Sequence, residues 1–592
     1  MNVNEGNKNN VFKDILVVLF LGIVTILSMF TFLSLLRLSI QSDGFFHFSR
    51  AEEIYRNLRS GVPFTFIATH TFQQTGVGNF LFYPDIFLYP WALLRFILRP
   101  VTAYYVWDSL FVFATFVIGY FCMKDYSKDR LRSVFFAIIY GLGTYHVYLG
   151  QCNFVLGEFI AYTFLPIVAL GIYHIVFANE KKWPLLALGM TLLTYSHILS
   201  VYIMCLFCAG LCLCTLLSRL WINRRRLLAL LKAIGLYFLL SAWFFIPLIT
   251  DYIGQEIVSP GAGFMLLSSP QQMIANSFNP TSALSSHSIG ILLMITAFVG
   301  WFFVKKNTQE LVTYIIGVCL LLMTTNFIPY AQIQNIKWLA NILGVIQFPY
   351  RLLSIATLFM AITASFIMVS FVRKGYRNSS RVGLIVFCLG IIMTCYYSEQ
   401  TPLVSQLTSP ARQYLKYPKS GTPTSYQALM KEAPGKIVNN DNYNDIFDYE
   451  VLFGQTDYYR ETAFSVHPKW GSFAPKAFSI QQHVMYVNGH AEHGRPHVAP
   501  NKISYEVFIS KKRAKVDLPV VAYHNTVVYD NGRRIAAKIS SRGTVLVRVG
   551  HGKHYLTVGY KPNKVYYVLL GIALLTWVIL ILLFTGILHR KK

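Results

Sequence analysis

The sequence predicts a polytopic α-helical membrane protein with an extracytoplasmic β-rich domain before its last helix. Three observations predict this fold class. The 592 residues are 54% hydrophobic and only 13% charged, and their mean hydropathy is positive. Twelve apolar runs are long enough for membrane helices, and a period-two pattern typical of β-strands appears near the end of the chain. This composition excludes a soluble globular protein.

Apolar runs predict spanning helices because about 20 residues, at 1.5 Å rise each, cover the roughly 30 Å hydrocarbon core. The runs lie near 15–38, 103–123, 133–149, 157–177, 184–199, 200–218, 229–250, 288–304, 311–328, 348–372, 381–398 and 565–588. The first is too long for a signal-peptide core and lacks a following cleavage site, so it should stay as an anchor. A further apolar stretch, 82–99, contains Pro84, Asp85 and Pro90, and we expect a re-entrant or interfacial helix there.

Basic residues in short loops predict the orientation, since Lys and Arg favour the cytoplasmic side. With the N-terminus inside, every short inside loop is basic; the residues are Lys124, Lys128, Arg130, Arg132, Lys181, Lys182, Arg219, Arg224 to Arg226, Lys305, Lys306, Arg373, Lys374, Arg377, Arg381 and Arg590 to Lys592. Both termini are therefore expected in the cytoplasm. The expected domains are a transmembrane core over 1–398 with its outer loop 41–102, an outer domain over 399–564, and a last helix with a basic tail over 565–592.

The outer domain carries 22 Lys and Arg residues against 12 Asp and Glu residues. Such a surface suits an anionic partner, either lipid headgroups or a phosphate-rich wall polymer, but an ordinary basic surface explains it equally well. From about residue 503 the apolar residues alternate, and Asn531-Gly532 is a type I′ hairpin signal. We predict a small antiparallel β-sandwich ending at Pro562. Residues 400–502 have weak periodicity and are expected to be mixed α/β or irregular.

Metal and disulfide chemistry receive little support from the sequence. All nine cysteines fall in or beside predicted spans, where packing explains them better than a metal site or a disulfide framework. His490, His493 and His497 have a spacing that could hold a metal, but solvated loop histidines are the simpler explanation. No cofactor or nucleic-acid partner is expected, and the sequence does not indicate a divalent metal but leaves it open.

The stretch SDGFFHFSR at 42–50 places ionisable groups directly after the first span. On a helix, Asp43, His47, Arg50 and Ile54 lie along one face, which predicts an amphipathic interfacial helix with a polar stripe. Asp43 could merely cap this helix, or the stripe could be a reactive site. The local pattern does not decide between these two interpretations.

Four other ionisable residues decide in favour of a site. Asp108, Glu158, His197 and Arg351 each lie near the outer end of a predicted span. Ionisable groups at membrane depth cost about 2.5 to 3.5 kcal/mol each, so they tend to face a wet cavity. Singly, water contact, packing or snorkelling explains each of them. Together with the stripe on 42–50, they predict one cavity open to the exterior and to the outer leaflet.

The residue types in this cavity suggest phosphate chemistry. No phosphate-binding loop or dinucleotide-binding turn occurs in the sequence, and nucleotide sugars are not expected outside the cell. A lipid phosphate is a group donor available there. Arginine and histidine could hold the phosphate as charge-assisted donors, while a carboxylate deprotonates an acceptor hydroxyl.

A family resemblance points the same way. The stretch SDGFFHFSRAEEIYRNLRSG resembles the first outer loop of GT-C fold glycosyltransferases, which use polyprenyl-phosphate sugars. Bacterial YfhO-type membrane proteins are similar in the runs NFLFYPDIFLYPWALL, NFVLGEFIAYTFLPI, LTYSHILS and IQFPYRLL. Their C-terminal region resembles the module from LPVVAYHNTVVYDNGRRIAAKISS to YKPNKVYYVLL. The resemblance covers nearly the whole chain.

The resemblance implies transfer of a sugar from undecaprenyl phosphate to a cell-envelope acceptor, such as a teichoic acid, outside the bacterial plasma membrane. By position, Asp43 matches the family's catalytic loop acid, the general base. Many GT-C enzymes carry paired acids here, whereas Gly44 follows Asp43, so a second acid would be Asp85, Asp108 or Glu158. The outer domain lacks a WWDYG-type motif, which argues against asparagine glycosylation.

Binding roles follow from side, depth and spacing. Arg351 and His197 are expected to bind the lipid phosphate, and Glu158 and His47 to orient the sugar or acceptor. Arg50, Asp85 and Asp108 complete the predicted substrate-binding set. The implied partners are the undecaprenyl-phosphate-linked sugar, an anionic cell-envelope polymer that the basic outer domain engages, and membrane lipids. A glycosyltransferase that charges the carrier lipid and a flippase would supply the donor.

Two other classes of function use the same features. A transporter or flippase of a lipid-linked saccharide would need a route to the inner side, yet the ionisable residues cluster outside. A non-catalytic scaffold that displays the β-rich module predicts that Asp43, Glu158 and Arg351 tolerate alanine.

Overall fold

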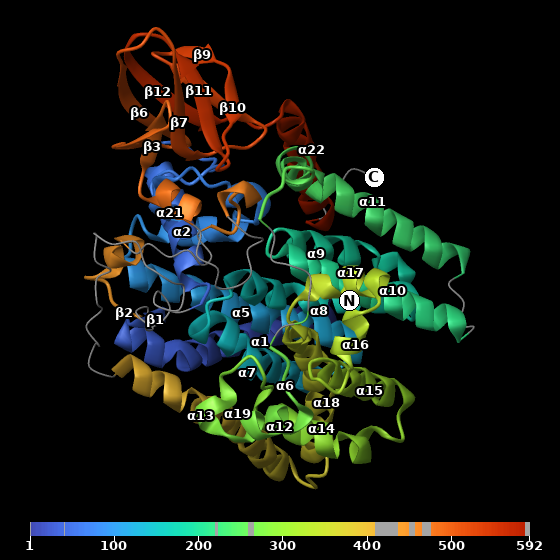
Figure 1. Ribbon diagram of the computed structural model, residues 1–592. Helices are drawn as coiled ribbons and strands as arrows, with labels where there is room; N and C mark the ends of the chain where they lie inside the picture. Colours follow the sequence, from blue (N-terminus) through green and yellow to red (C-terminus); the bar gives the residue numbers. More distant parts are fainter. Residues whose placement is uncertain are drawn as a thin grey trace.

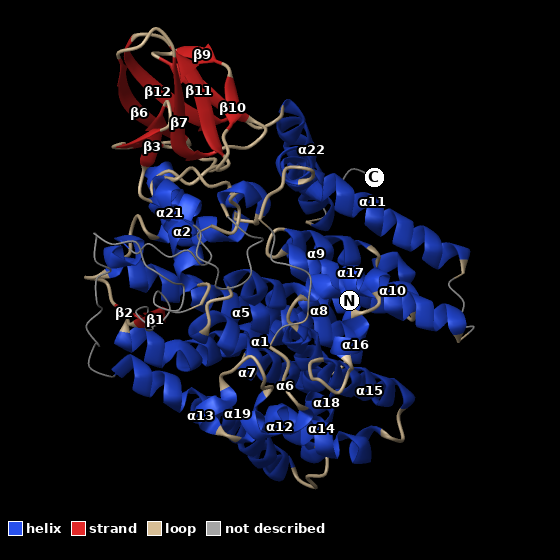
Figure 2. Ribbon diagram, in the orientation of Figure 1, coloured by secondary structure: helices blue, strands red, loops and turns tan. Residues whose placement is uncertain are grey.

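The structure is a computed structural model that describes residues 2–40, 42–218, 223–258, 264, 266–408, 436–448, 456–464 and 475–585. A large helical part carries a β-sandwich at one end (Figures 1 and 2). The predicted fold class is confirmed: the chain is a multi-pass α-helical membrane protein with a β-rich region before its last helix. Arg219 and the basic tail at 590–592 lie outside the described ranges.

Eight of the described helices are long and apolar enough to cross a membrane. They are α1 (Asn2–Leu35), α5 (Pro100–Ser127), α8 (Leu156–Val176), α10 (Ile198–Leu217), α11 (Arg224–Pro247, continued by the π-helical turn η5, Leu248–Tyr252), α18 (Leu353–Val372), α19 (Asn378–Thr408) and α22 (Lys564–Phe584). A ninth candidate is a pair bent by 41°, in which α6 (Arg130–Gly141) is followed by α7 (Thr144–Val147) and η3 (Tyr148–Cys152).

Three of the twelve predicted runs form helices shorter than a straight span needs. These are α9 (Pro184–Thr194), α14 (Gly290–Val304) and α15 (Thr308–Met323). Local signals fix where two of them begin: Gly290, the first residue of α14, has a positive φ of 78°, and the Asn307 side chain caps the first turn of α15 by accepting hydrogen bonds from it. Four further short helices are α12 (Pro270–Phe278), α13 (Pro280–Ala283), α16 (Tyr330–Gln334) and α17 (Lys337–Leu343).

The stretch 82–99 contains no helix long enough to span, as predicted. It consists of α3 (Asn79–Phe82), the turn η2 (Ile86–Leu88) and α4 (Tyr89–Leu94). The bend between them is bound to α2 (Gly44–Arg59), because Nη2 of Arg50 donates to the carbonyl oxygens of Tyr83 and Pro84 at 2.9 and 2.7 Å.

Helix α2 differs from the amphipathic interfacial helix that was predicted. Most of its residues are buried, and its polar side chains bind protein. The Glu53 carboxylate accepts hydrogen bonds from the backbone N–H groups of Thr69, His70 and Thr71, at 2.7 to 3.1 Å. Hydrogen-bonded partners are what allow ionisable groups to be buried. The outer loop is therefore an ordered layer of the protein.

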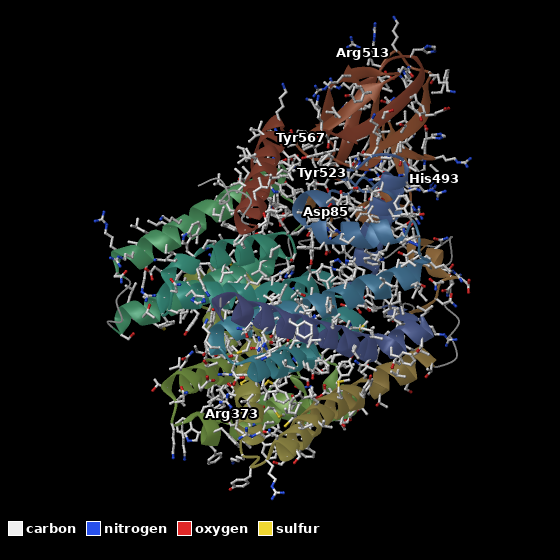
Figure 3. All side chains as sticks on the ribbon, turned by 180° about the vertical axis from the view of Figure 1, so that it is seen from behind. Asp85, Arg373, His493, Arg513, Tyr523 and Tyr567 are labelled. Atoms are coloured by element: carbon white, nitrogen blue, oxygen red, sulfur yellow. The ribbon has the colours of Figure 1, made fainter. Side chains whose placement is uncertain are left out.

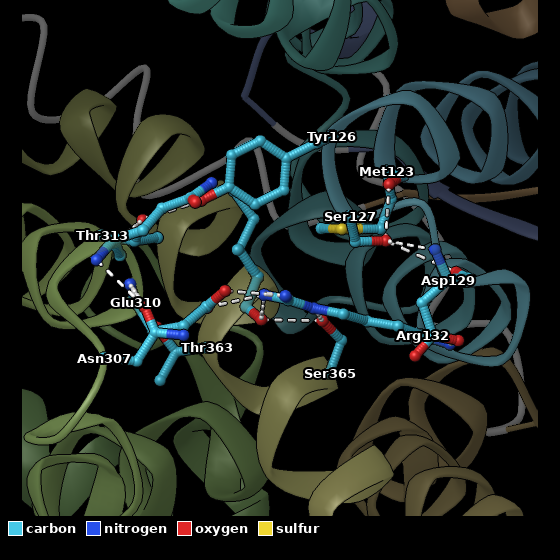
Figure 4. A network of polar contacts seen from close by, with 12 residues as sticks. Met123, Tyr126, Ser127, Asp129, Arg132, Asn307, Glu310, Thr313, Thr363 and Ser365 are labelled. Carbon is cyan, nitrogen blue, oxygen red and sulfur yellow. Dashed lines mark hydrogen bonds and ion pairs between the residues drawn. The ribbon is translucent and has the colours of Figure 1, made fainter. Parts of the chain in front are cut away.

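A second buried charge pair lies among the helices. Arg132 on α6 makes two hydrogen bonds of 2.7 Å to the two carboxylate oxygens of Glu310 on α15 (Figure 4). The same guanidinium contacts Ser365 and the carbonyl of Ile362 on α18. This bidentate geometry ties three helices together at one end of the bundle.

The β-sandwich consists of two antiparallel five-stranded sheets, ordered β10-β11-β7-β3-β4 and β5-β6-β12-β8-β9. The strands are β3 (Val484–Val487), β4 (His490–His493), β5 (His497–Ala499), β6 (Lys502–Ile509), β7 (Ala514–Val521), β8 (Thr526–Asp530), β9 (Arg533–Ile535), β10 (Ala537–Ile539), β11 (Thr544–Val549) and β12 (Gly552–Tyr560). The predicted hairpin is confirmed, since Asn531 and Gly532 both have positive φ between β8 and β9. The sandwich begins earlier than residue 503, because β3, β4 and β5 belong to it.

Between the helices and the sandwich the chain is described only in pieces. Helix α19 extends to Thr408, past the predicted end of the core at residue 398. Strand β2 (Lys436–Val438) returns to pair with β1 (Leu38–Ile40), directly after α1. The short helix α21 (Pro475–Gln481) then leads into β3.

The sandwich rests on the outer loop and is fastened to α11. Tyr523 accepts a hydrogen bond from the N–H of Gly78, and Figure 3 places it where the sandwich meets the helical part. The carboxylate of Asp251 in η5 accepts three hydrogen bonds of 2.7 to 2.8 Å, two from Asn525 and one from the Tyr560 hydroxyl. Helix α22 continues from β12 and packs against α11. The sandwich is therefore held by its contacts with the outer loop and with η5, and by its connection to α22.

Candidate active site

Asp43 lies between β1 and α2, and its side chain does not cap the helix. It occupies the N-cap position, but its backbone is helical and its carboxylate makes no capping hydrogen bond. The capping explanation of this acid therefore fails. Burial raises the pKa of Asp43 to about 6, while the Arg351 guanidinium opposes that rise. The half-buried carboxylate thus has an electrostatic partner that lies more than three hundred residues away in the sequence.

Glu158 reaches the same place from the first turn of α8. Its side chain is buried, and Oε1 accepts hydrogen bonds from Ser354 Oγ at 2.7 Å and Tyr145 Oη at 3.1 Å. Asp43 and Arg351 are both within electrostatic range of this carboxylate. Two carboxylates and one guanidinium therefore converge from three separate parts of the chain.

Arg351 is held by the turn η7 (Pro349–Leu352), just before α18. Its Nη1 donates to the carbonyl oxygen of Ile346 at 2.8 Å and to Gln347 Oε1 at 3.1 Å, and its guanidinium lies 4.8 Å from the Phe348 ring centre. Gln347 has a positive φ of 60°, a strained conformation for a residue with a side chain. Within the described ranges, only one of the three guanidinium nitrogens makes hydrogen bonds.

Tyr83 is a member of the site that the sequence analysis missed. Asp43, Glu158 and Arg351 are all within electrostatic range of its hydroxyl. Gly157 leaves space for that hydroxyl, since a Cβ at position 157 would lie 2.1 Å from Tyr83 Oη. Within the stretch 82–99 this tyrosine looks like any other packing aromatic. Only the glycine directly before Glu158 gives a signal, and it is a weak one.

His47 and His197 both contact the ring of Tyr83, with ring centres 5.4 and 5.8 Å away. Burial, followed by the nearby Arg50, lowers the pKa of His47, and burial lowers the pKa of His197 to about 3. Both rings are therefore neutral near pH 7. Burial among apolar groups disfavours imidazolium, so neither ring is a charge-assisted donor in this structure.

The two ring nitrogens of His47 are buried, and neither has a hydrogen-bond partner in the described part of the chain. His47, Tyr83 and Gly157 line a narrow crevice together with Tyr195 and Ser196. Buried polar atoms normally find partners, so an exception like this one is a candidate contact for a ligand. His197 is already engaged, because its Nδ1 lies 2.9 Å from Ser200 Oγ.

Three predicted binding residues have other roles or places. Arg50 is buried and uses its Nη2 on backbone carbonyls, as described above. Asp85 lies near Arg50 at the base of the sandwich (Figure 3), and burial raises the pKa of Asp85 to about 6. Asp108 is buried on α5, and its Oδ2 accepts a hydrogen bond of 2.7 Å from Gln151 in η3. Asp108 therefore supports the turn after α7 instead of joining the group around Asp43.

No metal centre emerges from the described residues, among which no group of three or more His, Cys, Asp or Glu side chains could hold a metal ion. His490 and His493 lie exposed on β4, and His497 lies exposed on β5. All three are on strands, although loops were expected there.

Comparison with known proteins gives distant similarities to solved structures. The cryo-EM structure of the arabinofuranosyltransferase AftD from mycobacteria matches 67% of this chain with 14% identity and a TM-score of 0.41; the match covers 27% of AftD, so the chain spans about a quarter of that protein's length. The crystal structure of ArnT from Cupriavidus metallidurans bound to undecaprenyl phosphate matches 66% of this chain and 77% of that chain, with 12% identity and a TM-score of 0.35. No protein-family model and no curated protein sequence matches the chain. The YfhO-type resemblance therefore stays a prediction.

Proposed function

We propose that this chain is a membrane glycosyltransferase that moves a sugar from a polyprenyl-phosphate donor to a hydroxyl of a cell-envelope acceptor on the outer face. The observation that carries the proposal is the convergence of Asp43, Glu158 and Arg351, which come from the first outer loop, α8 and the start of α18. A scaffold has no need of a half-buried acid that caps nothing.

Asp43 is the proposed general base. A pKa of about 6 leaves its carboxylate mostly ionised at pH 7 yet basic enough to accept a proton, which is the compromise that general bases need. In the transfer step, the acceptor oxygen forms a bond to the anomeric carbon as the bond from that carbon to the phosphate oxygen breaks. The acceptor proton moves to Asp43, and the configuration at the anomeric carbon inverts.

Arg351 is the proposed partner of the leaving phosphate. Its remaining guanidinium nitrogens can donate to phosphate oxygens, and they stabilise the negative charge that the polyprenyl phosphate gains as the bond breaks. Arginine suits this role because its planar donors match phosphate geometry.

The side chains of His47, Tyr83 and Glu158 are the proposed groups that orient the sugar and the acceptor. The unpartnered ring of His47 and the hydroxyl of Tyr83 can exchange hydrogen bonds with sugar hydroxyls without adding charge. Glu158 has one oxygen bound by Ser354 and Tyr145, so its Oε2 is the atom available to a substrate. More specifically, we propose that the carrier lipid is undecaprenyl phosphate and that the acceptor is a teichoic acid. We also propose that both termini of the chain lie in the cytoplasm.

The decisive experiment compares envelope polymers from cells that lack this protein with those from cells that express the wild type or Asp43→Asn. We expect sugar decoration with the wild type only, although membranes should contain equal amounts of both proteins. Glu492→Gln, which alters an exposed acid on β4, serves as the matched control and should restore decoration. Decoration by Asp43→Asn at the wild-type level would remove the base assignment.

A further inference from the structure

The outer face of the first sheet of the sandwich contains a cleft of about 820 Å³, far from the charged group around Asp43 in the sequence. It lies over β3, β7 and β11 and extends to α21. Among its described lining residues one is acidic, Asp517, and five are basic: Lys476, Arg513, Lys515, Arg542 and Arg548.

The floor of the cleft is a built polar structure. Arg542 is buried, and its Nε and Nη2 lie 3.1 and 3.2 Å from the two carboxylate oxygens of Asp517. Its guanidinium also stacks over the ring of Tyr486, 4.7 Å from the ring centre. Thr544 donates a further hydrogen bond to Asp517. Asp517 is therefore already neutralised by the protein.

Positive charge on the rim is left uncompensated. Lys515 on β7 and Arg548 on β11 are direct cross-strand partners, and both side chains are exposed. Like charges directly opposite each other destabilise a sheet. In the described part of the chain, neither side chain has an ion-pair partner, and neither does the exposed Arg513 beside them. A bound anion would relieve this repulsion.

The hairpin that forms one wall of the cleft is held in place by hydrogen bonds within the protein. The hairpin between β3 and β4 turns at Asn488 and Gly489, where φ is 51° and 91°. Asn488 donates its N–H to the carbonyl of Lys515 at 2.8 Å and accepts the N–H of Lys515 at its own Oδ1, at 2.9 Å. The hairpin is thus tied to the strand that carries the rim lysine. A site of fixed shape binds with less loss of entropy.

The opposite sheet has a different electrostatic character. There Lys553 pairs with Glu506 at 3.0 Å, and His554 pairs with Asp530 at 2.8 Å. The same sheet also carries exposed cations, Arg533 and Arg534 on its edge strand β9, that have no ion-pair partner in the described part of the chain. On the first sheet, by contrast, such cations line a cleft.

We propose that this cleft binds an anionic glycan, a sugar or polyol polymer that carries phosphate or carboxylate groups. The volume lies within the range of about 300 to 1,000 Å³ that is typical of ligand pockets, so it accommodates a short segment of such a polymer. Arg513 lies at the end of the sandwich farthest from the helices (Figure 3), so the ligand approaches from water and not from a lipid surface. The inference rests on the proposed function only in identifying this polymer as the acceptor.

The test measures binding by the purified full-length chain in nanodiscs of neutral lipid, with no sugar donor present. The probes are fluorescent poly(glycerol phosphate) and polygalacturonate, which separate phosphate from carboxylate recognition; neutral dextran and duplex DNA of equal length are comparators. Lys515→Ser/Arg548→Ser removes the rim pair. Arg533→Ser/Arg534→Ser removes two exposed cations from the β9 edge of the other sheet and is the matched control.

We expect one of the two anionic glycans to bind, and the rim variant to weaken that binding at least about tenfold, as the loss of charge-assisted bonds predicts. The control variant should change the dissociation constant by less than roughly twofold. Equal losses in both variants, dextran binding as tight as glycan binding, or DNA binding with the same dependence on the rim pair would each overturn the proposal. So would the absence of glycan binding.

Asp43→Asn separates this inference from the proposed function. That variant should bind the polymer as the wild type does while failing to transfer sugar. If the rim variant binds normally but Asp43→Asn is inactive, the cleft proposal fails and the enzyme proposal stands.

Discussion

Ser354 donates a hydrogen bond of 2.7 Å to Oε1 of Glu158, and this bond joins the first turn of α18 to the first turn of α8. Ser354→Ala should therefore let the buried carboxylate turn away from the site. We expect the rate of transfer to fall by roughly ten- to a hundredfold, since a hydrogen bond to a charged group is worth about 1.5 to 3 kcal/mol. Transfer kinetics with reconstituted protein give the measurement.

Thr357 provides the matched control one turn further along α18. Its hydroxyl is buried and has no hydrogen-bond partner in the described part of the chain. Thr357→Val, which keeps the shape of the side chain, should leave the rate and Tm near the wild-type values. Equal losses in the two variants would mean that the Ser354 effect is one of packing.

The pH dependence of transfer should report on Asp43. Because the base must be ionised, the rate should fall as the pH drops through about 6, and Asp43→Asn should lack this limb in its residual activity. Asp85 also has a pKa raised to about 6, so Asp85→Asn is the necessary comparison and should keep the midpoint. A midpoint that moves in Asp85→Asn would assign the titration to Asp85.

The same carboxyl predicts a stability effect of opposite sign. Its pKa in the folded protein lies above its ordinary value of 3.8, so the folded state binds the proton more tightly and ionisation costs stability. That cost is absent below pH 3.8, grows with pH and is complete above about pH 6. Asp43→Asn removes it, and its Tm at pH 7.5 should equal or exceed that of the wild type. A lower Tm would show that the carboxylate has a structural role.

Gly157→Ala should disturb the site without changing any polar group. The new Cβ would meet Tyr83 Oη at 2.1 Å, so the tyrosine must move. Displacing a positioning group by about 1 Å can cost roughly a hundredfold in rate. Gly210→Ala on α10 is the control, because nothing lies within 4 Å of a Cβ at that position. Wild-type transfer by Gly157→Ala would remove Tyr83 from the site.

Glu53→Gln tests the buried support of the outer loop. The carboxylate holds the backbone of residues 69–71, and the amide that replaces it loses the charge and one of the two acceptor oxygens. We expect the free energy of unfolding to drop by roughly 2 to 4 kcal/mol. Hydrogen exchange at the amides of 69–71 should quicken. Glu506→Gln, exposed on the sandwich and paired only with Lys553, should change neither quantity measurably.

The confirmed predictions are those that depend on local sequence patterns. The apolar runs became helices because nothing else satisfies a long apolar backbone, and Asn531-Gly532 formed its hairpin because the turn depends only on adjacent residues. Strands β3, β4 and β5 were not predicted as part of the sandwich, and for β4 the reason is the converse one. β4 is fully exposed at a sheet edge, so it lacks the buried alternation that marks a strand.

The sequence indicates which charged residues are candidates for the site, but it does not indicate which groups they contact. Asp43, Glu158 and Arg351 stand out as ionisable groups at helix ends. Arg50 and Glu53 look equally reactive in the sequence, yet their partners are backbone groups that only tertiary folding brings near them. Tyr83, by contrast, does not stand out among the neighbouring aromatic residues of the sequence. It lies in the site because Gly157 leaves space for its hydroxyl.

The fastening of the sandwich at Asp251 has a mechanical consequence. Because Asn525 and Tyr560 bind that carboxylate while α22 packs along α11, the sandwich is anchored to the helical part at two points. The cleft beside Lys515 and Arg548 is therefore kept at a set distance from the residues around Asp43.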